Sequence, residues 1–412
     1  MTPQTLFWLF ILLIVLDFLW DTYTDYLNAR RFDAPLPDEV RDIYDEADYR
    51  RSIAYKKMHY RLGLVKSVFS TLFILVLLFT RAFSWLDRVT GQWTDNPVMH
   101  SLLFFAVLLT LSFIFSLPFD YYAVFKIEEK FGFNRSTLKL FVTDKIKSWL
   151  LSLVFLFLVG YPVIWIYYHY PQDFWWMAWL VIAVFSLIMN LLYSDLIVPL
   201  FNKQTPLPPG ELRRKLEDLA RRAGFKIKDV YLIDGSKRST KANAYFSGFG
   251  PRKRIVLYDT LQEDLTPEEI TAVMAHEIGH YKKKHILWQW TVSMALTGLT
   301  LWLLSLALQS EILAQALGVS RPSFHIGLIA FGLLYGIVEH ITGILGNMLS
   351  RRFEFQADRY AMRLGYGDYL ATALKKLARK SYANLTPHPL YVKIHYSHPP
   401  LAQRLKHLYH EK

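Results

Sequence analysis

The chain has 412 residues, of which 53% are hydrophobic and only 20% are charged, with a formal net charge of +12. A soluble globular protein rarely combines so much apolar content with so few charges, so this composition predicts a membrane protein. The absence of cysteine excludes disulfides, thiolate metal ligands and a cysteine nucleophile. Basic loops of a multispanning protein explain the positive charge better than nucleic-acid binding, so no nucleic-acid partner is expected.

Seven apolar segments each approach the roughly 20 residues that a helix needs to cross a bilayer. They cover about residues 5–21, 64–83, 100–122, 149–169, 174–200, 286–309 and 325–349. The first span has no preceding basic residue and no clean cleavage pattern, so it is expected to remain as an anchor rather than act as a signal peptide. Lys and Arg concentrate in the first, third and fifth loops and after the last span, which predicts an outside N-terminus and a cytoplasmic C-terminus.

The spans divide the chain into membrane parts and polar parts. Residues 1–202 hold five spans and their loops, 203–285 form a polar segment, 286–349 hold two more spans, and 350–412 form a second polar segment. In the first polar segment, ELRRKLEDLARRAGF at 211–225 predicts a helix closed by Gly224. The runs VYLID, NAYFSGF and RIVLYDTL then predict three strands.

A second helix in this segment carries two histidines one helical turn apart. Thr266, Pro267 and Glu269 form an N-terminal signature with a threonine cap, proline at the first position and a capping-box glutamate. The helix is expected to run through TAVMAHEIGHYKKKH and on into the sixth span. Its histidines, His276 and His280, are four residues apart and therefore share one face, where both can bind one zinc ion.

Glu277 lies between these histidines and is suited to take a proton from a zinc-activated water, so it is the expected general base. The five-residue motif alone also arises by chance in unrelated chains. Glu354 on a later helix completes a His, His, Glu set, with one zinc per chain, and no other dense cluster of histidines and carboxylates competes along the sequence. Asp358 is expected to hold a ligand imidazole, with a surface ion pair to Arg351 or Arg352 as the alternative.

Several segments resemble the type I CAAX prenyl endopeptidases, the family of the yeast a-factor converting enzyme and the human prelamin-processing protease. They are VMAHEIGHYKKKH, NMLSRRFEFQADRYA, KIEEKFGFNRST at 126–137, DLIVPLFNKQTPL at 195–207, NAYFSGF at 243–249 and YSHPPLAQRL at 396–405. The resemblance covers nearly the whole chain. It implies a mainly α polytopic membrane protein, in which seven transmembrane helices form a chamber and a small α+β zinc metalloprotease domain lies on the cytoplasmic side.

The resemblance also implies roles for individual residues. It makes His276, His280 and Glu354 the zinc ligands and Glu277 the base, in agreement with the chemistry of the motif. Only the resemblance places Asn243, Ala244 and Tyr245 on an edge strand that pairs with the substrate. Only the resemblance makes His398 a stabiliser of the oxyanion, supported by Arg404. Without it, His398 is an ordinary loop histidine and NAYFSGF an ordinary strand.

Ionisable or polar side chains inside or at the ends of spans agree with a watery chamber, since such groups normally face a protein interior or water. They are Asp17, Asp120, Asn190, Asp195, Glu339 and His340. Simple alternatives remain, in which Asp120 and Asp195 are interfacial and Glu339 with His340 forms one satisfied pair. A transporter that carries the motif structurally would need inverted repeats or broken helices, which the sequence does not show.

The expected function is hydrolysis of a peptide bond near the C-terminus of prenylated or other membrane-associated substrates. An HtpX-type stress protease shares the zinc site but is shorter with fewer spans, and an inactive scaffold would not keep every catalytic residue type. Quality control of membrane proteins is an alternative physiological role. The expected partners are a peptide or protein substrate and the lipid bilayer, and the protein is expected to be a monomer. Its location is the cytoplasmic membrane in a prokaryote or the endoplasmic reticulum membrane in a eukaryote.

Overall fold

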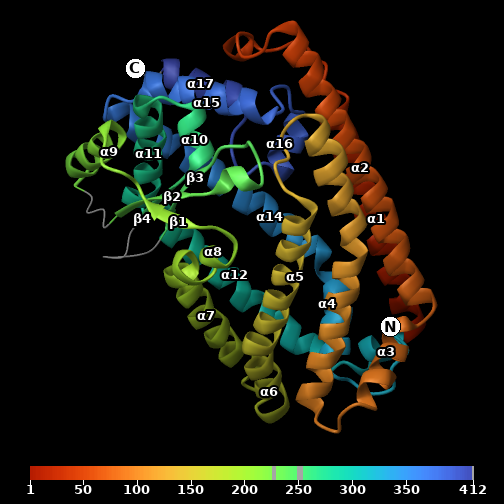
Figure 1. Ribbon diagram of the computed structural model, residues 1–412. Coiled ribbons are helices and arrows are strands. Elements are labelled where there is room, and N and C mark those ends of the chain that lie inside the picture. Colours follow the sequence, from red (N-terminus) through yellow and green to blue (C-terminus); the bar gives the residue numbers. More distant parts are fainter. Residues whose placement is uncertain (225–228, 248–253, 411–412) are drawn as a thin grey trace.

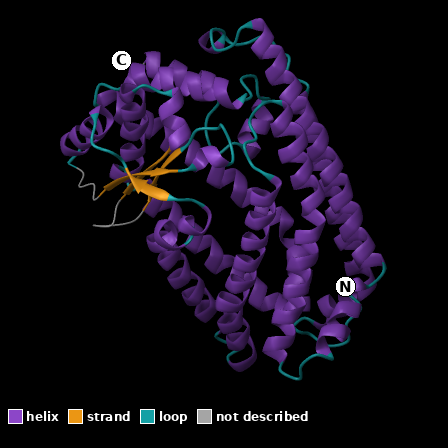
Figure 2. Ribbon diagram, viewed as in Figure 1, coloured by secondary structure: helices purple, strands orange, loops and turns teal. Residues whose placement is uncertain are grey.

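The computed structural model describes residues 1–224, 229–247 and 254–410 and is mainly helical (Figures 1 and 2). Among these residues, seven helical segments are long and apolar enough to cross a membrane, which confirms the seven predicted spans. Two of them contain a short π-helical stretch, η2 (Ala123–Glu128) and η3 (Leu156–Gly160). The segments are α1 (Pro3–Ala29), α2 (Glu46–Phe79), α4 (Pro97–Tyr122) with η2, α5 (Leu138–Phe155) with η3 and α6 (Tyr161–His169), α7 (Phe174–Leu196) with α8 (Val198–Phe201), α12 (His285–Leu308), and α14 (Phe324–Arg363).

The seven segments form a closed ring. Contacts run from α1 to α2, from α2 to η2, from α4 to α5, from α6 to α7, from α7 to α12, from α12 to α14, and from α14 back to α1. The N-terminus and α3 (Ala82–Gly91) lie at one end of this ring, here called the far end. Helix α11 (Pro267–Lys282), which carries His276 and His280, lies at the opposite end, here called the motif end (Figure 1).

Helix packing in the ring is concentrated at its two ends. At the far end, α1, α2, α3, α4, α13 (Glu311–Ala316) and α14 share an apolar cluster that includes Phe10, Phe104 and Ile326. In α14, no residue between Ala330 and Phe353 is buried, a stretch of about 33 Å at about 1.5 Å per residue. Part of this stretch, from Gly332 to Ile344, lines a cavity between α1, α2 and α14, which agrees with the expected chamber.

A small α+β unit closes the motif end (Figure 2). Its sheet has the strand order β1-β2-β4-β3, in which β2 and β4 are parallel and the other two pairs are antiparallel. The strands are β1 (Gln204–Pro206), β2 (Asp229–Ile233), β3 (Ala244–Ser247) and β4 (Arg254–Tyr258). The helices are α9 (Glu211–Arg222), α10 (Asp259–Asp264), α11 (Pro267–Lys282), α15 (Gly367–Ser381), α16 (Pro389–His395) and α17 (Leu401–His410), with the 3-10 turns η1 (Asp38–Val40) and η4 (Gly235–Lys237).

The helix and the three strands predicted for this unit are confirmed, and the short strand β1 was not predicted. Gly224 follows α9 with φ of +56°, a conformation that glycine adopts without strain. The main core of the unit lies between the sheet and the surrounding helices and includes Leu219, Ile255 and Ile278. Residue 225 of the predicted helix and residues 248 and 249 of the predicted strand lie outside the described residues.

Helix α11 begins as predicted but ends earlier. The Thr266 hydroxyl accepts from the N–H of Glu269 at 3.3 Å, and the Glu269 carboxylate accepts from the N–H of Thr266 at 2.8 Å, which completes the capping box. The expectation that the helix continues into the sixth span is wrong, because Lys284 adopts a left-handed conformation with φ of +57° between α11 and α12. This break turns His285 back toward His280.

The last span and the helix that carries Glu354 are one element. Helix α14 runs without interruption from the far end to the motif end (Figure 1). It passes through the boundary expected between residues 349 and 350, and its 40 residues correspond to about 60 Å. Glu354 and Asp358 therefore lie on a rigid extension of a membrane helix.

Candidate metal centre

A glycine allows the two helices of the site to approach each other closely. A Cβ atom added to Gly279 would lie 3.0 Å from the Cα of Ala357 and 3.1 Å from its carbonyl oxygen. Any larger residue would push α11 away from α14. The glycine of the HEIGH motif thus brings His276 and His280 beside Glu354.

The side chains of these three residues converge on one point. The two Nε2 atoms of His276 and His280 are 3.1 Å apart, although one helical turn separates their backbones. The Glu354 carboxylate lies 3.5 Å from Nε2 of His276 and 3.2 Å from Nε2 of His280. One ligand atom from each residue lies within 4.8 Å of the other two, and His276 and Glu354 are buried.

This donor set fits a zinc ion. Tetrahedral ligands at about 2.05 Å from zinc are separated by roughly 3.3 Å, which is close to the distances between these three groups. Oε2 of Glu354 is buried and makes no hydrogen bond among the described residues. A buried carboxylate oxygen without a hydrogen bond is unfavourable unless positive charge lies beside it, as Arg404 does at 3.2 Å and as a bound metal ion would. Two imidazoles and one carboxylate also form a ligand set typical of catalytic zinc.

A buried ion-pair network holds the first histidine. Oδ1 of Asp358 lies 2.8 Å from Nδ1 of His276, and Arg404 donates to both carboxylate oxygens of Asp358 at 2.9 and 2.5 Å. Arg404 also lies 3.2 Å from Oε2 of Glu354. Asp358 is fully buried and pairs with His276 and Arg404, so the alternative of a surface pair with Arg351 or Arg352 does not apply. Arg351 instead donates to backbone carbonyls of the segment 392–396.

The network determines the charge of its members. Burial favours the neutral imidazole of His276, but its hydrogen bonds with Asp358 and Glu354 outweigh this effect and raise its pKa to about 9. Burial likewise disfavours the guanidinium of Arg404, but the charge of Asp358 raises its pKa above the ordinary value. A cation that binds Nε2 of His276 must therefore displace a proton from that nitrogen.

His285 belongs to the site and was missed by sequence reasoning. Its Nε2 donates to Oε1 of Gln356 at 2.9 Å, so in the neutral ring its Nδ1 is an acceptor. Nδ1 of His280 lies 3.1 Å from that acceptor and must supply the hydrogen. The ring of His285 also stacks on Phe353 at 4.1 Å. This chain of hydrogen bonds keeps Nε2 of His280 free to bind a metal ion.

The other expected site residues lie around the three ligands in different ways. Glu277 is half-buried on α11, between the two histidines in sequence. His398 is largely exposed, and its Nδ1 lies 3.0 Å from Oε1 of Glu354. Ala244 and Tyr245 begin β3, and Asn243 precedes it. In the described part of the sheet, β3 is an edge strand that pairs with β4 alone.

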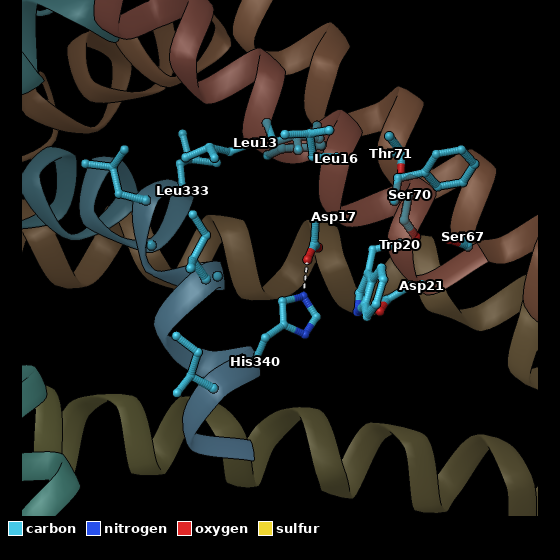
Figure 3. A pocket seen from close by; sticks show the side chains of 18 of the residues that line it. Leu13, Leu16, Asp17, Trp20, Asp21, Ser67, Ser70, Thr71, Leu333 and His340 are labelled. Atoms are coloured by element: carbon cyan, nitrogen blue, oxygen red, sulfur yellow. Dashed lines mark hydrogen bonds and ion pairs between the residues drawn. The ribbon is translucent and has the colours of Figure 1, made fainter. Parts of the chain in front are cut away.

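Five of the six polar groups named within the spans have polar partners, but not always the expected ones. His340 lies 2.5 Å from Asp17 of α1, rather than in a pair with Glu339 (Figure 3). Of the other four groups, Glu339 is exposed, and three have polar partners: Asp120 with Lys145, Asp195 with Arg254, and Asn190 with the carbonyl of Ser186. The first two pairs agree with the interfacial alternative.

A mostly apolar cavity of about 700 Å³ lies between α1, α2 and α14, here called the membrane cavity (Figure 3). Its lining includes Leu13, Ile14, Ser70, Ile74, Leu333 and Ile337. The pair of Asp17 and His340 contributes a polar spot to its wall. Ile344 also lines it and lies ten residues before Glu354, about 15 Å along the axis of α14.

Seven membrane helices that present a His, His, Glu site at one end define an integral-membrane metalloprotease. Residues 25–203 match the family model described as CAAX prenyl protease N-terminal, five membrane helices, and residues 206–412 match that of peptidase family M48. The chain therefore belongs to peptidase family M48 and, within it, to the CAAX prenyl proteases of type 1. This family implies a metal cofactor and a peptide substrate.

The similarity to known proteins covers nearly the whole chain. A CAAX prenyl protease 1 homolog from Oryza sativa is 36% identical, covering 96% of this chain and 95% of the relative. CAAX prenyl protease 1 from Saccharomyces cerevisiae is 34% identical over 95% of this chain and 92% of the relative. The crystal structure of Ste24p from S. mikatae matches with a TM-score of 0.94 at 32% identity, covering 98% of this chain and 99% of that one.

Proposed function

We propose that this protein is a zinc endopeptidase whose metal is held by His276, His280 and Glu354. The observation that carries the proposal is the convergence of two Nε2 atoms and one carboxylate within 4.8 Å at the end of a membrane helix ring. Asp358 and Arg404 hold His276 and Glu354 in place through the buried ion-pair network. Zinc, when bound there, lowers the pKa of a coordinated water toward neutrality and polarises the scissile carbonyl.

The side chains of this protein then move protons and stabilise charge. Glu277 accepts a proton from the attacking water, whose oxygen forms a bond to the carbonyl carbon. The same carboxyl group then gives that proton to the nitrogen that leaves as the C–N bond breaks. His398 donates a hydrogen bond to the oxyanion that develops on the carbonyl.

The edge of β3 is the proposed binding site for the substrate backbone. The carbonyl of Asn243 accepts from the N–H of Tyr258 in β4 at 3.0 Å. The next N–H, on Ala244, therefore faces away from β4, and it donates to the side-chain oxygen of Asn243 at 2.9 Å. A carbonyl of a substrate strand would accept the hydrogen bond from this N–H in place of the Asn243 side chain. Tyr245 packs on the apolar cluster beneath the sheet.

Changes at Ala244 and His398 should have different kinetic effects. Ala244→Pro removes the outward N–H but not a bond to β4, so we expect a raised KM with a smaller change in kcat. His398→Ala should lower kcat by about 10²–10³-fold with little change in KM, as for other donors to an oxyanion. Steady-state kinetics on one peptide substrate measures both effects.

Ala244→Ser keeps the N–H and is the matched control for the proline variant. Zinc content must equal that of wild type in all three variants, because loss of metal would imitate either effect. Wild-type kcat in His398→Ala would refute its role at the oxyanion. A KM in Ala244→Pro equal to that of Ala244→Ser would show that the substrate pairs elsewhere.

His285→Ala should weaken zinc binding by about 10- to 100-fold, because groups that orient a ligand histidine typically contribute that much. Competition with a chelator of known affinity measures the change. His285→Asn, whose amide oxygen can accept from Nδ1 of His280, should recover part of the lost affinity. Equal zinc affinity in His285→Ala and wild type would exclude a role for this residue.

The proposed substrates are membrane-associated chains that end near the cleavage site, including C-terminally prenylated ones. The relatives are named CAAX prenyl proteases, and the membrane cavity offers apolar space along the helix that carries Glu354. Burial of only a few isoprenoid carbons, at about 0.8 kcal/mol each, corresponds to tenfold or more in affinity. A farnesylated CAAX peptide should therefore show a kcat/KM about tenfold or more above its unfarnesylated form.

Filling the membrane cavity should reduce this preference. Gly336 lines the cavity, and a Cβ atom at this position would meet nothing within 4 Å. Gly336→Phe should therefore slow cleavage of the farnesylated peptide and leave the unfarnesylated one unaffected. Gly63→Phe is the matched control, because Gly63 also has open space around it but does not line the cavity. Equal rates for both peptides in wild type would show that the farnesyl group does not contribute to substrate recognition. This result would not affect the proposed peptidase activity.

The basic loops place the motif end on the cytoplasmic side in this proposal. The two termini lie at opposite ends of the helix ring (Figure 1). Reporter fusions after Lys412 and between residues 92 and 96 should report opposite sides, with the C-terminal one in the cytoplasm. If both fusions report the same side, the proposed topology is wrong.

The proposed location is the cytoplasmic membrane in a prokaryote or the membrane of the endoplasmic reticulum in a eukaryote. One chain is proposed to be sufficient for activity.

A further inference from the structure

A second group of metal-binding side chains lies at the far end of the ring. Among the described residues, two groups of three histidines and carboxylates bring their ligand atoms within 4.8 Å of one another. One is the candidate metal centre, and the other is Asp87 of α3, His100 of α4 and His325 of α14. No competing cluster was expected from the sequence, because His325 lies far from Asp87 and His100 along it and meets them only in the folded chain.

The three side chains converge on one carboxylate oxygen. Nε2 of His325 lies 2.7 Å from Oδ1 of Asp87, and Nε2 of His100 lies 3.5 Å from the same oxygen. The centroids of the two imidazole rings are 4.6 Å apart. The separations between ligand groups in the candidate metal centre are 3.1 to 3.5 Å. A small outward shift of the Asp87, His100 and His325 side chains would therefore make room for an ion of the size of zinc.

Hydrogen bonding directs one nitrogen of His325 toward this point. The ring is fully buried, and its Nδ1 lies 2.9 Å from the hydroxyl oxygen of Ser101. The hydroxyl hydrogen of Ser101 is donated to the carbonyl of Pro97 at 3.1 Å, so its oxygen accepts from Nδ1 of His325. Nε2 is then the nitrogen that faces Asp87. A ligand histidine in a metal site is held in the same way.

The surroundings hold the rings in place and leave one side open. The ring of Phe104 lies 4.5 Å from that of His325, within the apolar cluster of the far end. A Cβ atom on Gly91 would lie 3.3 Å from the His100 ring, so this glycine allows α3 to close against it. The side chains of His100 and Asp87 are 21% and 17% exposed, which gives an ion a path to the group.

We propose that Asp87, His100 and His325 bind a divalent transition-metal ion such as zinc, separate from the candidate metal centre. Two imidazoles and a carboxylate are donors that suit zinc. On binding, the proton shared between Nε2 of His325 and Oδ1 of Asp87, which are 2.7 Å apart, passes to solvent. His100 turns its Nε2 from the backbone carbonyl of Asp87, now 2.9 Å away, to the ion, and the proton of this nitrogen moves through solvent to Nδ1. Ser323, whose hydroxyl oxygen lies 3.2 Å from Nε2 of His325, or a water completes the coordination.

This ion would join three helices at the far end, so it would act as a structural link rather than in the reaction. Metal that binds only the folded chain raises its thermal stability by mass action. The test uses full-length protein in which the candidate metal centre has been emptied by His276→Ala and Glu354→Ala. In this background, binding of Zn²⁺ is measured by equilibrium dialysis and that of Co²⁺ by its visible absorption.

The background protein should bind one equivalent of either ion, and Zn²⁺ should raise its Tm. Adding His100→Gln or Asp87→Asn should weaken binding by about 100-fold or more, since loss of a ligand costs at least as much as loss of a supporting group. Both changes should also abolish the rise in Tm. His169→Gln is the control, because His169 is an exposed histidine outside the group and its loss should change neither readout.

Two results would overturn the proposal. One is a folded background protein that binds no ion and shows no rise in Tm, which would leave the group as a hydrogen-bonded link between helices. The other is binding that survives both His100→Gln and Asp87→Asn. Because the candidate metal centre is already empty in this background, neither result affects the proposed peptidase activity.

Discussion

Glu277→Gln should lower kcat by about 10²–10⁴-fold while the protein keeps its zinc and its fold. The amide has nearly the size and shape of the carboxylate, so the packing of α11 does not change. It cannot accept a proton from the attacking water, which removes general-base catalysis. Single-turnover cleavage of a CAAX peptide, with zinc content measured on the same samples, separates metal binding from chemistry.

Glu268→Gln provides the matched control for this variant. Glu268 lies on the same helix and pairs with Lys215 at the protein surface, away from the ligands. The control should keep wild-type turnover. A zinc-replete Glu277→Gln protein with substantial activity would mean that another group is the base.

Replacing two ligands, with His276→Ala and Glu354→Ala together, should remove one equivalent of zinc per chain and all measurable peptidase activity. The three ligands form a complete set for catalytic zinc, and one ligand alone cannot hold the ion. The loss of Glu354 also removes a partner of His398 and one of the two carboxylates beside Arg404. Metal analysis of purified wild-type and variant proteins gives the difference directly.

Glu339→Gln is the control for this experiment, because Glu339 lies on the same helix but is exposed and distant from the ligands. Its zinc content and activity should match those of wild type. Circular dichroism and gel filtration must show that the double variant is folded. Equal zinc content in the folded double variant and wild type would refute the ligand assignment.

Much of the fold was predictable because membrane helices have a strong sequence signal. Runs of about 20 apolar residues identified all seven spans. The capping box of α11 was also predictable, since Thr266 and Glu269 satisfy each other locally. The shared face of His276 and His280 follows from helical spacing alone, and their ring nitrogens do meet at 3.1 Å.

Other features depended on contacts that no local pattern reveals. The run of lysines after His280 contains no glycine or proline, so nothing in it indicates the left-handed Lys284 that ends α11. Hydropathy falls near residue 350, but α14 continues, because packing against α11 stabilises it beyond the last span. His285 and the group at Asp87 acquire partners only through tertiary structure.

The most direct test of the central claim is the position of zinc in crystals of the purified protein, measured by anomalous scattering at the zinc absorption edge. We predict a strong peak between α11 and α14, about 2.0–2.2 Å from Nε2 of His276, Nε2 of His280 and a carboxylate oxygen of Glu354. A zinc-replete protein with no anomalous peak between these three residues would contradict the account.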